Sequence, residues 1–325
     1  MKYIERLRHG GIMTNYQCPA ACRHCLYACS PKRDSDYITK QSANNICKLL
    51  ILGGCRSVHI GGGEPFLNFD RLIVLLEAAK KAGIRVEYVE TNGFFAEDED
   101  RVKRYLRALF EAGVNTLCIS LDPFHAEYVP FALPLRLAEL CRHNNFNYFL
   151  WQERFLQYMN RLAPDTAHSR ESLEKWISPQ YIINTARSYG LSIGGRAVNI
   201  EEEFAEPKPV NSMMVTKPCE RLKSTDHFHV DLYGRYIPPG CTGIVIPLEE
   251  VVNDIPTGKY PVFEALISNG AAGLVTFAQK HGFKPKENYT SSCVLCFYTR
   301  KWLSENISCC PELDTKHYEA SLTYY

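Results

Sequence analysis

The sequence predicts an α/β protein built on an open, partial barrel of parallel strands, and three observations support this prediction. Short runs rich in β-branched residues recur along the chain, at residues 57–60, 84–90 and 114–120. Helical stretches that end in glycine lie between them; one is expected to begin after Asn68 and to stop at Gly83. The repeat measures about 30 residues, which is the size of one strand-plus-helix unit.

Counting these units predicts six strands, a (β/α)6 arrangement that resembles part of a TIM barrel. The first strand precedes Cys18, and the others lie near residues 57, 85, 115, 146 and 191. In such folds the chemistry gathers where the strands end. We therefore expect a barrel over residues 1–200, an acidic and proline-containing linker over 201–218, and a C-terminal extension over 219–325.

The overall charge gives no sign of a nucleic-acid or membrane partner. The 325 residues include 37 Lys and Arg against 36 Asp and Glu, so no broad basic field is predicted. The first ten residues lack the apolar core of a signal peptide, and the aliphatic run at 72–76 is far too short to cross a bilayer. We expect a cytoplasmic protein that binds neither nucleic acid nor membrane.

The fourteen cysteines are unevenly placed. A cytoplasmic chain keeps its thiols reduced, so clusters of cysteine indicate metal sites rather than disulfides. One cluster crowds into twelve residues and another lies between Cys219 and Cys310. The isolated cysteines are expected to be small buried hydrophobic residues; these are Cys47, Cys55, Cys118 and Cys141.

The first cluster, CPAACRHC, sets Cys18, Cys22 and Cys25 at i, i+4 and i+7. On a helix these positions share one face, and on a loop they converge as well, so the three thiols are expected to meet at one point. A closed tetrahedral zinc site is one interpretation, with His24 or Cys29 as the fourth ligand. It leaves unexplained the glycine run GGGEP, residues 61–65, which follows the second predicted strand.

Together, the three-cysteine segment and the GGEP-type turn resemble the radical S-adenosylmethionine (radical SAM) superfamily over residues 10–200. The resemblance implies a 4Fe–4S cluster held by Cys18, Cys22 and Cys25. It also implies S-adenosylmethionine as the ligand of the fourth iron, which explains why three cysteines suffice. By the same resemblance, Cys29 is not a ligand and His24 packs beside the cluster.

The resemblance also implies residues that contact the cofactor. Gly62, Gly63 and Glu64 would receive its methionine ammonium group, and Arg196, in the segment GGRA, would contact its carboxylate. Polar residues at the ends of the third and fourth strands would touch the methionyl and ribose parts; these are Thr91, Asn92, Ser120 and Asp122. Each of the four is also a common type of strand-end cap or turn residue.

The C-terminal cysteines resemble the auxiliary-cluster extension called SPASM, or its shorter form, Twitch. The shared features are a cysteine, a hairpin with Gly234, a second cysteine and a later CxxC. The resemblance implies one auxiliary 4Fe–4S cluster, although zinc would suit the same thiols. The implied ligands are Cys219, Cys241, Cys293 and Cys296.

A weaker resemblance links the chain to radical enzymes that epimerise residues in ribosomal peptides. Those carry a hydrogen-donating cysteine beside the hairpin cysteine, whereas Gly240 precedes Cys241 here. Cys310 is therefore the expected catalytic thiol, if a thiol takes part. On the hairpin, His227, His229 and Asp231 alternate along a strand and form either a row facing substrate or a solvated face.

These features predict a radical SAM enzyme that abstracts hydrogen from a peptide, with an external electron donor such as flavodoxin or ferredoxin. One alternative is a radical SAM enzyme that acts on a small metabolite. Another is a non-catalytic barrel protein stapled by zinc.

Overall fold

The computed structural model describes residue 4 and residues 6–152, 156–178 and 180–323. Its main sheet has eight strands in the order β5-β4-β3-β2-β1-β7-β8-β9, and β1 to β5 are parallel. The elements of this parallel part are β1 (His9–Met13), α1 (Lys40–Leu52), β2 (Ser57–Gly61), α2 (Phe69–Ala82), β3 (Arg85–Thr91), α3 (Glu99–Glu111), β4 (Thr116–Ser120), α4 (Pro123–Ala126), α5 (Ala132–His143) and β5 (Asn147–Trp151).

The predicted α/β fold class with a parallel sheet is confirmed, and its local signals act as expected. The Asn68 side chain accepts a hydrogen bond from the Arg71 backbone N–H at 3.2 Å and so caps α2. Helix α2 stops before Gly83, which takes the left-handed conformation. Strand β5 near residue 146 also lies where it was predicted.

The prediction of a sixth strand near residue 191 is wrong. Residues 191–196 form no strand, because this segment packs tightly against the loop that follows β1. Gly195 has φ +52°, and a Cβ there would lie 2.2 Å from the Leu26 carbonyl oxygen. The Arg196 backbone N–H donates to the Cys25 carbonyl at 3.1 Å. The backbone groups of this segment are thus engaged with the loop rather than with a sheet.

The sixth parallel strand comes instead from the C-terminal part of the chain. Strand β7 pairs with β1 in parallel, and β8 and β9 continue the sheet in antiparallel pairs. The predicted C-terminal extension therefore shares one sheet with the barrel; the division into two domains stays a prediction. The bounds of these strands are β7 (Asp226–Val230), β8 (Arg235–Ile237) and β9 (Ile246–Pro247).

The predicted linker is partly ordered structure. Residues 201–204 belong to helix α9, and Lys208–Pro209 forms β6, which pairs with β10. The remaining elements are α6 (Leu156–Met159), α7 (Arg170–Trp176), α8 (Tyr181–Tyr189), α9 (Ala197–Phe204), β6 (Lys208–Pro209), α10 (Leu248–Val252), α11 (Pro261–Lys280), β10 (Asn288–Tyr289), α12 (Ser292–Asn306) and α13 (Thr315–Leu322), with short 3-10 helices at Pro65–Asn68, Val210–Met213 and Glu220–Leu222.

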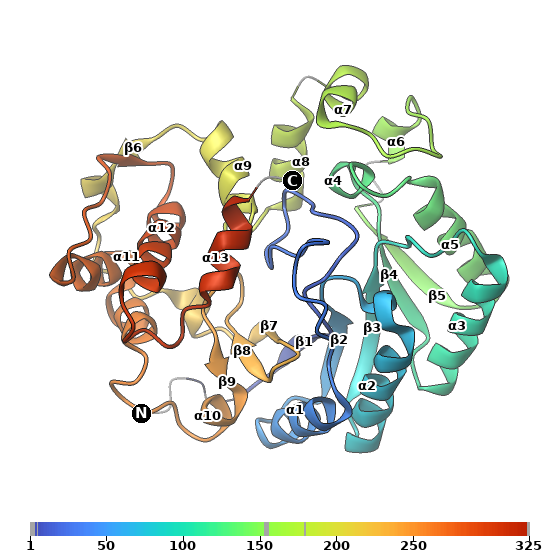
Figure 1. Cartoon of the computed structure of the whole chain (residues 1–325), viewed down its shortest axis with the longest axis horizontal. Coiled ribbons are helices and arrows are strands. Elements are labelled where there is room, and N and C mark those ends of the chain that lie inside the picture. The colour runs from blue at the N-terminus through green and yellow to red at the C-terminus, as the bar shows by residue number, and fades with distance from the viewer. Residues whose placement is uncertain (1–3, 5, 153–155, 179, 324–325) are drawn as a thin grey trace.

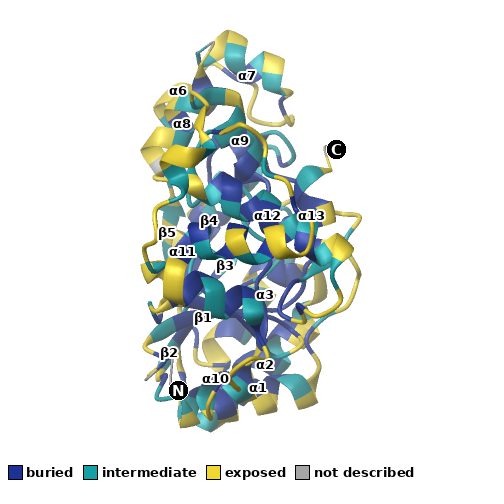
Figure 2. Ribbon diagram, turned by 90° about the vertical axis from the view of Figure 1, so that its left-hand side faces the viewer, coloured by how far each residue is buried: buried dark blue, intermediate teal, exposed yellow. Residues whose placement is uncertain are grey.

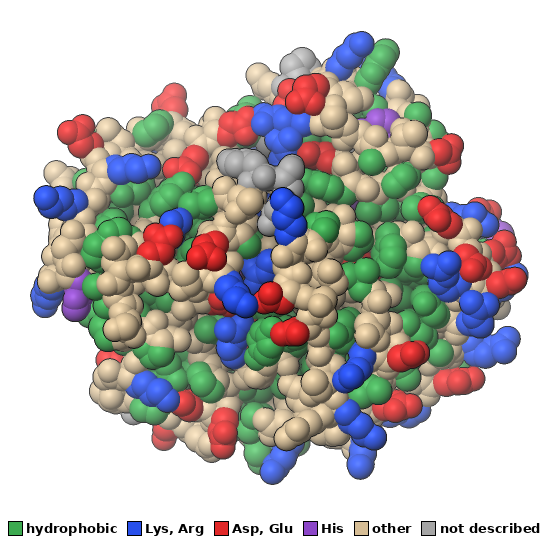
Figure 3. Space-filling model, in the orientation of Figure 1, with side chains coloured by type: hydrophobic (Ala, Val, Ile, Leu, Met, Phe, Trp, Pro, Cys, Tyr) green, Lys and Arg blue, Asp and Glu red, His purple; other side chains and the backbone are tan. Residues whose placement is uncertain are grey.

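The loop after β1 runs between two groups of helices (Figure 1). Helices α2, α3 and α5 lie on one side of it, and α11, α12 and α13 lie on the other. Buried residues concentrate in the strands and on the inner helix faces, and exposed ones on the outer parts of α1 and α7 (Figure 2). Acidic and basic side chains are interspersed over the face seen in Figure 3, as the balanced composition predicts.

Among the described residues, one helix, α11, is long and apolar enough to cross a membrane by length and composition alone. Half of its apolar window is buried inside the protein, and the backbone is non-helical at Gly270. Both features are typical of a core helix. The cytoplasmic location stays a prediction.

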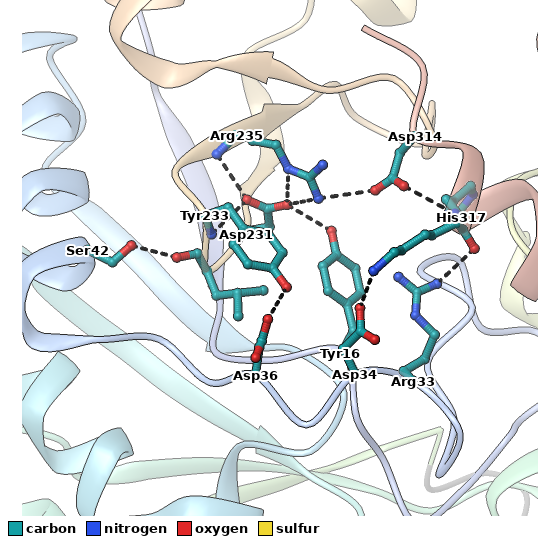
Figure 4. Close-up of polar contacts among 12 residues, drawn as sticks. Tyr16, Arg33, Asp34, Asp36, Ser42, Asp231, Tyr233, Arg235, Asp314 and His317 are labelled. Atoms are coloured by element: carbon teal, nitrogen blue, oxygen red, sulfur yellow. Dashed lines mark hydrogen bonds and ion pairs between the residues drawn. The ribbon is translucent and has the colours of Figure 1, made fainter. Parts of the chain in front are cut away.

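A buried carboxylate ties the loop after β1 to the C-terminal part of the chain (Figure 4). Asp231, which follows β7 and is fully buried, accepts hydrogen bonds from the Tyr16 hydroxyl at 3.0 Å and from Arg235 Nε at 2.7 Å. Arg235 in turn contacts Asp314 at 3.1 Å, just before α13. A buried charge is tolerated only when it is paired and hydrogen-bonded, as Asp231 is.

Replacing Asp231 by Ala should therefore destabilise the protein by about 3–5 kcal/mol, because it leaves Arg235 and the Tyr16 hydroxyl without their buried partner. The matched control is Tyr233→Phe, which removes only the half-exposed hydroxyl that bonds Asp36 at 2.9 Å. It should shift stability by less than about 0.5 kcal/mol. Urea unfolding measures both, and equal small losses would show that the carboxylate does not hold the two parts together.

Candidate functional site

The four clustered cysteines after β1 line one cavity of about 260 Å³. The segment that carries them is a loop, not a helix: the Cys18 N–H donates to the Ser30 carbonyl at 3.2 Å, and the Cys25 N–H donates to the Cys22 carbonyl at 3.0 Å. These bonds fold the loop back on itself. Cys18, Cys22, Cys25 and Cys29 are thereby brought to the same cavity, and the spacing of the first three predicts that they meet.

The thiols of this loop differ in their proton affinity. A hydrogen bond with Cys29 holds the pKa of Cys25 well below its ordinary value, and the nearby Arg196 guanidinium acts in the same direction against the effect of burial. Burial raises the pKa values of Cys18 and Cys22. Cys25 is thus the thiol of the three predicted ligands that ionises first, and a thiolate is the form that binds metal.

The Arg196 side chain is hydrogen-bonded to the backbone of the cysteine loop. Its Nε donates to the Cys22 carbonyl at 2.9 Å and its Nη2 to the Cys29 carbonyl at 2.6 Å, while its buried Nη1 has no hydrogen-bond partner. The guanidinium is almost completely buried. Its observed contacts are with the loop backbone; a contact with the cofactor carboxylate stays a prediction.

The glycine run and the end of β3 meet at Glu64. Its buried carboxylate accepts hydrogen bonds from Thr91 Oγ1 at 2.9 Å, the Asn92 N–H at 2.9 Å and the Phe66 N–H at 3.1 Å. Burial nevertheless raises its pKa to about 7. The Asn92 side chain also points to Cys18, with Nδ2 3.7 Å from Sγ. Three predicted cofactor residues and one predicted ligand are therefore in one connected group.

The two predicted residues at the end of β4, Ser120 and Asp122, have different environments. Ser120 lines the cavity, whereas Asp122 is fully buried and caps α4 by accepting from the Phe124 and His125 N–H groups at 2.9 and 3.0 Å. Asp122 also contacts His125 Nδ1 at 2.5 Å. Although burial opposes both shifts, this pair lowers the pKa of Asp122 and raises that of His125.

His125 is a residue that the sequence-based prediction missed. Besides Asp122 it forms a side-chain hydrogen bond with Cys22, which offsets part of the effect of burial on that thiol, although the pKa of Cys22 stays above its ordinary value. Its place three residues after Asp122 on a short helix was the available signal. His24 lies beside it in the cavity and stacks on Phe124, with ring centres 4.7 Å apart.

The cavity is also lined by strand residues that the sequence-based prediction did not include. Strand alternation turns Tyr88 and Glu90 toward it from β3, since side chains two apart share a face. Cys118, which we expected to be an ordinary buried residue, also lines it and faces the same space as Ser120. The other isolated cysteines, Cys47, Cys55 and Cys141, are fully buried in the core as predicted.

The hairpin residues do not form a solvated face. His229 and Asp231 are buried. His227 is exposed and, like Glu90, lines the cavity. That interpretation of the alternation is wrong because β7 is an inner strand of the sheet, with β1 on one side and β8 on the other.

A second cavity, of about 630 Å³, is lined by the four C-terminal cysteines that were predicted to act together: Cys219, Cys241, Cys293 and Cys296. Ser291 caps α12 by accepting from the Val294 N–H at 3.3 Å, which places Cys293 and Cys296 in the first two turns of that helix. A hydrogen bond with Cys241 lowers the pKa of Cys219 to about 6.

A buried arginine again accompanies the thiols. Arg300 lines this second cavity, hydrogen-bonds Cys296, and donates to the Thr242 carbonyl at 2.8 Å. Cys309 is exposed and Cys310 is buried, and neither is among the described residues that line the two cavities. The structure therefore does not bring Cys310 to either cysteine set, and its catalytic role stays an untested prediction.

The N-terminal part of the chain matches the radical SAM superfamily over residues 12–151. Over this region the chain is similar to the radical SAM domain. The matched region includes the cysteine loop, the glycine run and strands β2 to β5, and the resemblance seen in the sequence is confirmed for it. Proteins of this superfamily use a 4Fe–4S cluster and S-adenosylmethionine.

Two curated relatives illustrate the likeness. The putative peptide biosynthesis protein YydG of Bacillus subtilis is 27% identical over 122 residues, which is 36% of this chain and 37% of the relative. A GTP 3′,8-cyclase of Rhizobium etli is 26% identical over 116 residues, 34% of this chain and 31% of the relative. The chain thus spans about a third of the length of the curated relatives it matches.

Solved structures show a lower likeness. The crystal structure of BtrN in complex with AdoMet and 2-DOIA aligns with 82% of this chain and 89% of its own, at 12% identity and a TM-score of 0.47. Native anSMEcpe with bound AdoMet aligns with 76% of this chain and 80% of its own, at 16% identity and a TM-score of 0.44.

The residues at the first cavity fit a 4Fe–4S cluster with one open iron. Cys18, Cys22 and Cys25 supply three sulfur ligands, the type that such clusters take. Arg196 places a positive charge with one unpartnered nitrogen beside them. The cavity extends past the thiols to Glu64 and Ser120, so a further ligand has space there.

Because Arg196 fixes two carbonyls of the cysteine loop, Arg196→Met should release iron from the reconstituted protein to a chelator about 10-fold faster or more, the low end of what outer-shell changes cost. The matched control is Arg33→Met on the same loop, where Arg33 is half-buried and donates to the Lys316 carbonyl at 3.4 Å. Chelation followed by absorbance measures both rates. Equal rates in the two variants would contradict this role of Arg196.

Proposed function

We propose that this protein is a radical SAM enzyme that cleaves S-adenosylmethionine reductively and abstracts hydrogen from a peptide. The observation that carries the proposal is the convergence of Cys18, Cys22 and Cys25 with the Glu64–Asn92 pair on one cavity. A closed zinc site explains the thiols alone. It explains neither the carboxylate at the rim nor the space that continues beyond it.

In this proposal Cys18, Cys22 and Cys25 hold the cluster, and Glu64 and Ser120 contact the cofactor. Once bound, the cluster and S-adenosylmethionine supply a 5′-deoxyadenosyl radical that abstracts hydrogen, with the electron coming from a donor such as flavodoxin or ferredoxin. The chain's own residues position the substrate and exclude water from the radical. The partly buried Tyr27, which packs 5.0 Å from the His229 ring, and the loop held by Asp231 close the cavity around it.

The second thiol set holds an auxiliary cluster in this proposal. Cys219, Cys241, Cys293 and Cys296 supply four sulfur ligands, and Arg300 offsets their negative charge. Because β7 joins the strand that carries the first cysteine loop, the second site is built onto the barrel itself. It is therefore placed to relay an electron and to stabilise the C-terminal part of the chain.

A peptide is the substrate class that the surroundings of the first cavity favour. Strand β5 is the edge strand of the sheet, and its half-exposed Trp151 lines the cavity. An edge strand offers N–H and C=O groups to an extended peptide, and side chains beside it give specificity. The likeness to a putative peptide biosynthesis protein supports the same class.

A nucleotide substrate is the second candidate, because several relatives are GTP 3′,8-cyclases. A triphosphate calls for Arg or Lys at its phosphates. Among the described residues that line the first cavity none is Arg or Lys, and its basic side chains are His24, His125 and His227. The cavity lining thus offers a triphosphate no guanidinium or ammonium group.

Changing Cys18, Cys22 and Cys25 together to Ala should abolish the formation of 5′-deoxyadenosine from S-adenosylmethionine in the reduced, reconstituted protein. The matched control is the triple Ala variant of Cys47, Cys55 and Cys141, which are buried but lie outside both cysteine sets. It should retain cleavage within a few-fold of the wild type. Undiminished cleavage of S-adenosylmethionine in the variant that lacks Cys18, Cys22 and Cys25 would contradict the proposal.

Incubation with peptides encoded beside the gene, followed by mass spectrometry, should give a peptide of altered mass, whereas GTP should remain unchanged.

In the Cys293→Ala, Cys296→Ala variant, 5′-deoxyadenosine should still form but the product should fall by at least about 10-fold. Its iron content should drop from about eight to about four per chain, since each cluster carries four. An unchanged product yield would limit the second site to a structural role, and turnover of GTP would replace the peptide by the nucleotide.

A further inference from the structure

Four histidines gather beside the cavity, and the function proposed above assigns a chemical role to none of them. His9 lies on β1, His59 on β2, and His227 and His229 on β7. The ring centres of His59 and His227 are 5.0 Å apart with nearly parallel planes, and His9 lies 5.8 Å from His59 and 6.1 Å from His227. We refer to His9, His59 and His227 as the histidine triad.

We propose that the histidine triad is a binding site for a divalent transition-metal ion such as Zn²⁺. One ring nitrogen of each of the three lies within 4.8 Å of the others. Ligand nitrogens at about 2.1 Å from a tetrahedral zinc are about 3.4 Å apart. Small side-chain rotations therefore bring the three nitrogens into the coordination sphere of one ion.

The hydrogen bonds of the triad leave nitrogens free for a metal. The Nε2 of His59 lies 3.0 Å from Nε2 of His229, while its fully buried Nδ1 has no hydrogen-bond partner. A buried polar atom without a hydrogen-bond partner destabilises a protein. If the rings served packing alone, this nitrogen would have no reason to lack a partner. A metal ion at Nδ1 supplies the missing partner.

His9 carries the outer-shell contact that metal-bound histidines usually have. Its Nε2 lies 2.8 Å from the Glu87 carboxylate, which leaves Nδ1 as the available nitrogen. Such a carboxylate fixes the ring and makes its other nitrogen a stronger ligand. Glu90 lies 3.8 Å from Nε2 of His59 on the other side. Two carboxylates thus flank the site and offset the charge of a divalent ion.

The backbone is shaped around the triad. The β1–β7 register shifts at His9 so that His227 is the extra residue on β7, and its φ is +67°. A bulge of this kind re-aims a side chain. On β1, a Cβ at Gly11 would lie 2.4 Å from Nε2 of His59 and 2.6 Å from the His229 ring. Glycine at this position makes room for the rings.

Two of the three rings have surroundings that favour the neutral form. Burial, followed by the neighbouring His227 and His9 rings, lowers the pKa of His59 to about 3, and burial also lowers that of His227. Neutral imidazole is the ligand form. His227 also lines the cavity, so the triad borders the space where a substrate would lie.

The test uses the reconstituted holoenzyme, treated with a mild chelator and then dialysed against zinc sulfate. Elemental analysis should find one zinc per chain, and zinc-edge X-ray absorption should show imidazole nitrogens at about 2.0–2.1 Å. The exposed position allows His227→Gln to fold, and this variant should lose the zinc. Glu87→Gln should weaken zinc affinity about 10–100-fold.

The matched control is His143→Gln, a change at an exposed histidine outside the barrel that should keep the zinc. Zinc bound only through sulfur, at about 2.3 Å, would overturn the proposal, since it would lie in a cysteine set. Equal zinc content in the wild type and His227→Gln would overturn it as well. Neither result depends on cleavage of S-adenosylmethionine, so the test is independent of the function proposed above.

Discussion

Strand β7 pairs with β1 in parallel, with Gly10 opposite Phe228 and Gly11 opposite His229, and both sites depend on this pairing. Strand β1 leads into the loop that carries the first cysteine set. In the chain, β7 lies between Cys219 and Cys241, two cysteines of the second set. The ladder therefore fixes where the two sets stand relative to each other. Asp231, directly after β7, adds a buried bond to Tyr16 on the first loop.

Both thiol sets face the same electrostatic problem, and the chain solves it in the same way. Several thiolates in a buried site repel one another and lose hydration, which favours protonation. Each set is accompanied by one almost completely buried arginine, Arg196 at the first and Arg300 at the second. Each guanidinium donates to backbone carbonyls that position the thiols, at Cys22 and at Thr242. The arginines thus act on both the charge and the shape of the sites.

Much of this arrangement could be predicted from the sequence, because its signals are local. The strand–helix repeat, the Asn68 cap and the cysteine spacings depend on neighbouring residues only. The segment at 191–196 misled the prediction because its apolar start resembles a strand, while Gly195 and Arg196 bind a loop 170 residues earlier.

The remaining errors have the same origin. The His227–His229–Asp231 alternation reads as a solvated face until β7 is known to lie inside the sheet. The meeting of His9, His59 and His227 depends on three strands brought together by long-range pairing, and no spacing in the sequence reports it. Cys118 looks like an ordinary buried thiol, and only the fold turns it toward the cavity.

The proposed function requires that the loop from Cys18 to Cys25 holds a cluster with one iron open to S-adenosylmethionine. Electron paramagnetic resonance of the reduced protein, with and without S-adenosylmethionine, is a direct test of this requirement. The cofactor should change the cluster spectrum in the wild type and equally in the Cys293→Ala, Cys296→Ala variant, where only the first cluster remains. A spectrum in that variant that S-adenosylmethionine leaves unchanged would contradict the proposed function.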